Sequence, residues 1–159
     1  MALLIVFILV VVMFSSGGGS SASLLAIAQR QGNIAKVAEL ALQDTDSQAV
    51  KNVAINAQLA AQSDQKSLTA LAGQFGISFS EKDLELGINP EVQSQFETAK
   101  AAGLLNQTAL ETLAAEIQAY QVVLAAGFEQ TGSEELKQLL AEQHEATELL
   151  AIQIQNTQP

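Results

Sequence analysis

Apolar residues recur at spacings of three and four along most of the chain that follows residue 23. This spacing places side chains on one face of an α-helix, with polar residues on the other. The clearest stretch runs from Gln107 to Glu129, where Leu110, Leu113 and Ile117 begin a regular series. The pattern predicts four long helices and one short helix, over residues 24–43, 48–74, 90–102, 107–129 and from 134 onward.

Serines and a glycine mark the ends of these predicted helices. Ser47 and Ser133 stand where a hydroxyl can accept a hydrogen bond from the first turn of the next helix. Ser80 followed by Asp83 has the spacing of a capping box, and Gly103 stops the short helix. We therefore expect an all-α fold, a bundle of four to five helices.

The head of the chain, residues 2–14, is an unbroken apolar run. Thirteen such side chains require lipid, another subunit, or removal with a precursor. As a helix, which we favour over an extended strand, the run covers about 20 Å, whereas a bilayer core needs about 30 Å. No Lys or Arg precedes it, which disfavours a cleaved signal.

Burial of this head in a membrane, in a complex or at the centre of a filament remains open at this stage. We expect the assembly or membrane contacts to be made by Leu3, Leu4, Ile5, Val6, Phe7, Ile8, Leu9, Val10, Val11, Val12, Met13 and Phe14.

A glycine- and serine-rich stretch separates this head from the predicted bundle. Residues 15–23 include Gly17, Gly18 and Gly19, a composition typical of a flexible spacer. The stretch is a plain tether or a hinge formed by the three glycines. The predicted organisation is therefore head (1–14), spacer (15–23) and helical bundle (24–159).

The charge and composition exclude several classes of partner and chemistry. The net charge is −10 and the seven cations are scattered singly, which argues against nucleic acid and leaves the apolar head as the means of contacting lipid. The chain has no cysteine, so disulfides and thiolate metal sites are excluded.

Candidate reactive side chains are few. Helical bundles hold metal pairs through Glu-x-x-His spacings, and this chain contains none. The sole histidine, His144, has Glu148 four residues on, which is a weak pair for a metal. Asp64 falls on an apolar face, where we expect it to reach solvent, and Asn106 fits either a glycosylation sequon or a helix cap. We expect no catalytic site, no metal and no cofactor.

Short helical motifs resemble an exported, ferritin-like bacterial family, the domain of unknown function numbered 4142. The similarity covers about residues 28–152. The motifs that carry it are Gln-Gly-Asn-Ile-Ala at 31–35, Ser47 with Val50-Lys51, Leu-Thr-Ala-Leu-Ala at 68–72 with Gly76, Gln118–Leu124 and Gly132–Lys137. The resemblance implies a helical bundle and export.

The chain departs from that family where the family has polar residues. Ala60-Ala61 replaces an Asp-His pair, Tyr120 replaces a histidine, and Leu149-Leu150 lies near the last family histidine. The resemblance therefore implies architecture and a ferritin-like module without a metal site. The order of apolar head, glycine break and helix is also similar to type IV pilins, although Ile5 stands where pilins have glutamate.

These observations predict a non-enzymatic structural or assembly subunit. In this interpretation the protein is exported to the cell surface or to an extracellular filament, where the head is buried among copies of itself or in a complex. The helical body then faces outward. The alternative is a membrane-tethered or periplasmic ferritin-like binding module that has no metal site.

Overall fold

The computed structural model describes residues 19–85 and 89–158, which form six helices and no strand. The all-α helical bundle predicted from the sequence is confirmed. The helices are α1 (Gly19–Asp44), α2 (Gln48–Gln74), α3 (Glu81–Glu85), α4 (Glu91–Ala102), α5 (Leu105–Gln130) and α6 (Glu134–Gln155).

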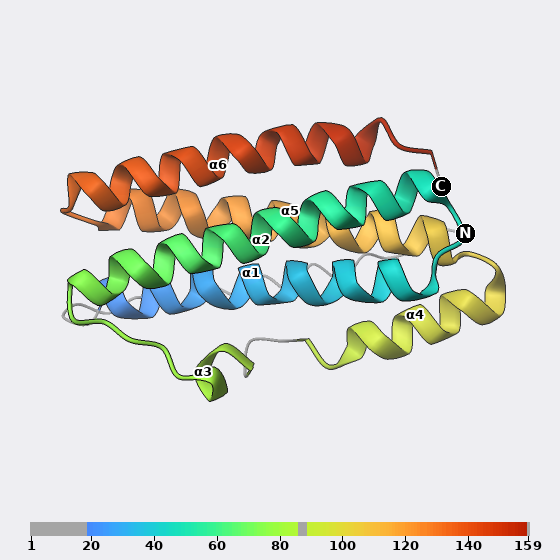
Figure 1. The fold of residues 1–159 in the computed structure, drawn as a ribbon, viewed down its shortest axis with the longest axis horizontal. Helices are drawn as coiled ribbons and strands as arrows, with labels where there is room; N and C mark the ends of the chain where they lie inside the picture. Colours follow the sequence, from blue (N-terminus) through green and yellow to red (C-terminus); the bar gives the residue numbers. More distant parts are fainter. Residues whose placement is uncertain (1–18, 86–88, 159) are drawn as a thin grey trace.

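The four long helices α1, α2, α5 and α6 form the bundle. Helix α1 packs against α2 and α5, and α6 packs against the same two helices on the other side. Figure 1 shows α1 and α6 running in one direction and α2 and α5 running in the other. Each long helix is therefore antiparallel to the two long helices that lie beside it, whereas α2 and α5, which touch across the bundle, are parallel.

One long connection joins α2 to α5. It contains the short helices α3 and α4, which lie along the side of the bundle and contact α1, with α4 also contacting α5. This crossover returns the chain to the end where α2 began, so α2 and α5 run parallel. One long crossover therefore connects the antiparallel pair α1–α2 to the antiparallel pair α5–α6.

The core is built from leucine, isoleucine and alanine, with Tyr120 and Phe96 as its largest fully buried side chains. Ala54, Ala57 and Ala61 are buried on α2, where short side chains allow neighbouring helices to approach closely. Phe96 lies on α4, so the crossover contributes to the core as well as covering it.

The helix ends follow the local signals in the sequence. The Ser47 hydroxyl accepts a hydrogen bond from the Val50 N–H, and the Ser133 hydroxyl accepts one from the Leu136 N–H. Gly103 has φ of 71°, a left-handed conformation that residues with a side chain rarely adopt.

The capping box before α3 is present as predicted. The Ser80 N–H donates to Asp83 Oδ2 over 3.1 Å, and the Asp83 N–H donates to the Ser80 hydroxyl over 3.2 Å. The Ser80 hydroxyl and the Ser80 N–H both donate to the Asp83 carboxylate, and these two hydrogen bonds lower the pKa of Asp83.

The start of α1 corrects the predicted spacer. The helix begins at Gly19 rather than Leu24, so residues 19–23 are helical. Ser23 is only 6% exposed, and its hydroxyl donates to Gln130 Oε1 over 2.6 Å. Packing against the end of α5 therefore outweighs the low helix propensity of these small residues.

Three side chains also differ from the predicted pattern. Phe75 and Phe128 continue the three- and four-residue spacing of apolar residues along α2 and α5, but they are 46% and 38% exposed. Phe75 is the C-cap that follows α2, so its backbone is no longer helical and its side chain does not continue the buried face of the helix. Phe128 lies beside a surface cleft. Asn106 is not a helix cap, because α5 begins at Leu105.

Candidate functional site

A cluster of four polar side chains occupies the centre of the bundle. Each long helix contributes one residue: Gln31 from α1, Asp64 from α2, Tyr120 from α5 and Gln143 from α6. Gln31, Tyr120 and Gln143 are at most 3% exposed, and Asp64 is half-buried. We refer to these residues as the core polar cluster.

The Tyr120 hydroxyl connects the core polar cluster. It accepts a hydrogen bond from Gln31 Nε2 over 2.7 Å and lies 3.0 Å from Gln143 Oε1 and 3.2 Å from Asp64 Oδ2. A phenol has one proton, so it donates to one of these two acceptors at a time. Gln143 Nε2 donates to the backbone carbonyl of Asp64 over 3.0 Å, which joins α6 to α2 directly.

Burial controls the charge of this cluster. Desolvation raises the pKa of Asp64 from 3.8 to about 6, against the opposing effect of its hydrogen bond from Tyr120. Burial, together with the nearby Asp64 carboxyl, raises the pKa of Tyr120 well above its ordinary value. The phenol therefore stays protonated at neutral pH and serves as a hydrogen-bond donor rather than a nucleophile.

The core polar cluster combines three kinds of polar side chain. It offers one carboxyl group, two amides and a phenol, and no group of three His, Cys, Asp or Glu side chains suited to a metal exists among the described residues. Gln31 Oε1 is buried and accepts no hydrogen bond from the described part of the chain. The cluster links all four long helices at one level and so fixes their register.

The sequence analysis drew attention to Asp64 and Tyr120 without predicting that they meet, and it missed the two glutamines. The expectation that Asp64 reaches solvent is only half right, because its carboxyl also accepts from Tyr120. A signal for the glutamines was present: Gln31 lies between Ile27 and Ile34 at helical spacing, on the apolar face of α1.

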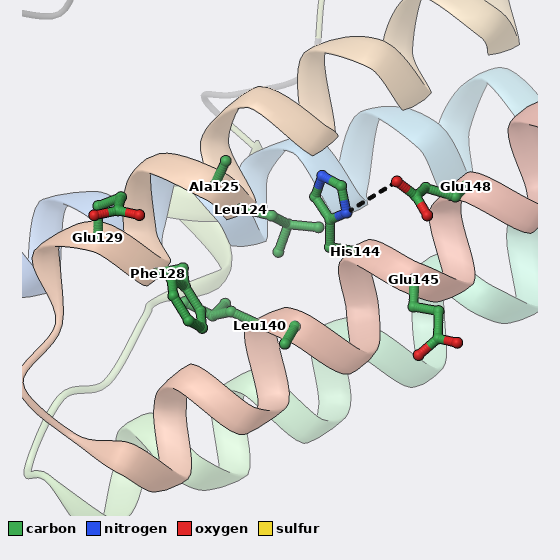
Figure 2. Close-up of a pocket in the computed structure, with 9 residues that line it drawn as sticks. Leu124, Ala125, Phe128, Glu129, Leu140, His144, Glu145 and Glu148 are labelled. Atoms are coloured by element: carbon green, nitrogen blue, oxygen red, sulfur yellow. Dashed lines mark ion pairs between the residues drawn. The ribbon is translucent and has the colours of Figure 1, made fainter.

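A cleft between α5 and α6 is the second candidate site. Its volume is about 280 Å³, close to the lower end of the range for small-ligand pockets. Leu124 and Leu140 are buried residues that form its apolar floor, and Phe128 lies beside them (Figure 2). Ala125 and Ala141 also line it, and their short side chains leave its mouth open.

Charged and titratable side chains surround this cleft. His144 Nδ1 lies 3.7 Å from Glu148 Oε1, one helical turn away on α6. Glu129 and Glu145 also line the cleft, and its lining contains neither Lys nor Arg. The cleft therefore combines an apolar floor with a predominantly acidic rim.

The predicted attachment residues lie outside the part of the chain that the structure describes. This applies to Leu3–Phe14 and to Gly17 and Gly18 of the proposed hinge, whereas Gly19 begins α1. The helices of residues 19–85 and 89–158 include none with both the length and the apolar character needed to cross a bilayer.

Comparisons of the chain with protein-family models, with curated proteins and with solved structures find no match.

Proposed function

We propose that the protein is a non-enzymatic structural or assembly subunit. Residues 2–14 attach it to copies of itself or to another complex, and the helical bundle faces outward. The observation that carries this proposal is that residues between Leu24 and Ile154 build a core of their own. The apolar run is therefore best explained by attachment rather than by folding of the body.

The chemistry of the described side chains supports a non-enzymatic role. The raised pKa of Asp64 is a property often found in active sites, but the partners of this carboxyl are a phenol and amides. His144 lies on the surface and pairs with Glu148 instead of approaching Asp64 or Tyr120. These groups lack the arrangement of nucleophile, base and orienting residue that covalent catalysis uses.

An exported, membrane-tethered binding module is the second candidate function. The specific observation in its favour is the α5–α6 cleft, which provides a place for a ligand on the body itself. The crossover between α2 and α5 is also consistent with a ferritin-like module. In this alternative, residues 2–14 hold the body at a membrane rather than in a filament.

Deletion of residues 2–14 tests the proposal. We expect the full chain to sediment as large assemblies visible by electron microscopy without added lipid, and the deleted chain to be a folded, helical monomer by circular dichroism and light scattering. A full-length variant with Val6→Asp and Val10→Asp is the matched control, because it removes apolar character without changing the length. We expect it to behave like the deletion.

The outcomes separate the two candidate functions. Assemblies that persist after deletion would contradict the attachment role of residues 2–14. A full chain that is a single copy in detergent, and that binds vesicles only while residues 2–14 are present, would favour the membrane-tethered module.

A further inference from the structure

We propose that the α5–α6 cleft binds a small organic cation that carries an apolar body, such as an arylalkylammonium ion. This inference concerns the body of the protein and is independent of how residues 2–14 are held. It rests on the shape of the cleft, its apolar floor and the charges around it.

The shape of the cleft and its apolar floor favour a ligand with an apolar group. Leu124 on α5 and Leu140 on α6 both line the cleft. Gly127 of α5 lies in tight contact with a side chain of α1 and with Leu140 of α6, so no larger residue fits there without displacing them. A Cβ atom at position 127 would lie 2.8 Å from Ile27 Cδ1 and 3.2 Å from Leu140 Cδ1. Phe128 remains 38% exposed at the edge of this floor, which leaves aromatic surface available for contact.

The carboxylates around the cleft favour a positively charged ligand. Glu129, Glu145 and Glu148 all line the cleft, and only Glu148 has an ion-pair partner among the described residues, namely His144. Lys137 is the one lysine of α6. It pairs with Glu134 over 3.0 Å and does not line the cleft. A cation would therefore meet carboxylates that have no partner of opposite charge and the partly exposed ring of Phe128, both of which attract it.

The size of the cleft selects a small molecule. A volume of about 280 Å³ accommodates a single ring with a short alkylammonium chain, whereas a docked helix needs an extended groove. The carboxylates repel anions, and a fully apolar ligand would make no favourable electrostatic interaction with them. An apolar body with one positive charge matches both parts of the site.

The single histidine provides a site-specific measurement. We would titrate the full chain, labelled only in histidine and held in a non-ionic detergent, with phenethylammonium and follow the His144 ring signals by nuclear magnetic resonance at fixed pH. His144 is the sole histidine of the sequence, so its signals need no assignment. We expect saturable shifts with phenethylammonium, weaker binding of the neutral analogue 2-phenylethanol, and no shift with methylammonium at matched concentrations.

Two sets of variants test the two halves of the argument. Glu129→Gln with Glu145→Gln should weaken phenethylammonium binding about tenfold at low salt and leave 2-phenylethanol unchanged. The control, Glu97→Gln with Glu111→Gln, removes the same net charge at exposed positions away from the cleft and should have no effect. Ala141→Phe should fill the mouth and abolish binding, whereas Ala115→Phe, elsewhere on α5, should not.

Three results would overturn the proposal. One is equal affinity for phenethylammonium and 2-phenylethanol, which would remove the role of charge. Another is an equal loss of phenethylammonium affinity in the Glu129/Glu145 variant and in the Glu97/Glu111 control. That result would show that the net negative charge of the protein, rather than the carboxylates of the cleft, attracts the ligand. The third is unchanged binding in a folded Ala141→Phe variant, which would place the ligand elsewhere.

Discussion

The core polar cluster and the α5–α6 cleft have helices α5 and α6 in common but use polar side chains in opposite ways. Gln143 and His144 are neighbours on α6: the first is 3% exposed and bonded to Tyr120 and to the backbone of Asp64, whereas the second lines the cleft. In the cluster, each of the four polar residues has a partner on another helix. Around the cleft, two carboxylates have no opposite charge.

The difference separates a structural role from a binding role. Polar groups that satisfy one another inside a bundle stabilise it, and removing one leaves the others buried without a partner. Charged groups around a hollow contribute little to folding, because solvent screens them. Substitutions in the cluster should therefore change stability, and substitutions at the cleft should change binding.

The largest expected effect comes from two aromatic residues on α5. Tyr120→Ala should lower the free energy of unfolding by about 3–5 kcal/mol, because it opens a cavity and breaks the cluster. Phe128→Ala, eight residues further along, should cost only about 1 kcal/mol, because its side chain is already partly in solvent. Urea unfolding followed by circular dichroism measures both. Equal losses for the two variants would contradict the distinction between the regions.

Removal of the Tyr120 hydroxyl alone isolates the hydrogen bonds. Tyr120→Phe keeps the ring but leaves Gln31 Nε2 without its 2.7 Å acceptor and removes the donor to Gln143 and Asp64. We expect a loss of about 1–3 kcal/mol in urea unfolding. A stability equal to that of the unaltered protein would show that the ring, rather than the polar cluster, holds the helices together.

Local signals in the sequence predict much of the fold. Ser47, Ser133 and Gly103 act through contacts within a few residues, so their roles could be recognised without the structure. The helical start of α1 could not be, because the Ser23 side chain bonds to Gln130, more than one hundred residues away.

The sequence pattern also does not reveal how the residues of the two sites come together. A hydrophobic pattern identifies a buried face, but it does not indicate that Gln31 and Gln143 on two such faces meet Tyr120. The cleft depends on the short side chains of Ala125 and Ala141 lying along the same hollow on two helices, a relation between distant parts of the chain. Partnerships of this kind become visible only when the helices are placed side by side.

The pH dependence of stability tests the charge of the core polar cluster. The pKa of Asp64 rises from 3.8 in the unfolded chain to about 6 in the folded one, so folding favours the protonated carboxyl. The stabilising contribution of the protonated Asp64 carboxyl is complete below about pH 4 and is lost as the pH rises through about 6. Asp64→Asn removes this dependence.

We expect the Asp64→Asn variant to match the unaltered protein near pH 4 and to exceed its stability at pH 8. Linkage gives at most about 3 kcal/mol for such a shift, and partial exposure reduces this to about 1–2 kcal/mol. Urea unfolding at the two pH values measures it, with Glu97→Gln as an exposed control. A variant that is less stable than the unaltered protein at pH 8 would contradict the raised pKa.

The smallest expected effect is at the rim of the cleft. Glu148→Gln breaks the ion pair with His144, but both side chains are partly exposed and lie one helical turn apart. Such pairs contribute about 0.3–0.5 kcal/mol, so urea unfolding at pH 6, with exposed Glu142→Gln as the control, should show a change no larger than this. A loss above about 1 kcal/mol would mean that the cleft charges hold α6 in place, as the core polar cluster does. The carboxylates at the rim would then be part of the fold, and their presence would no longer favour a ligand.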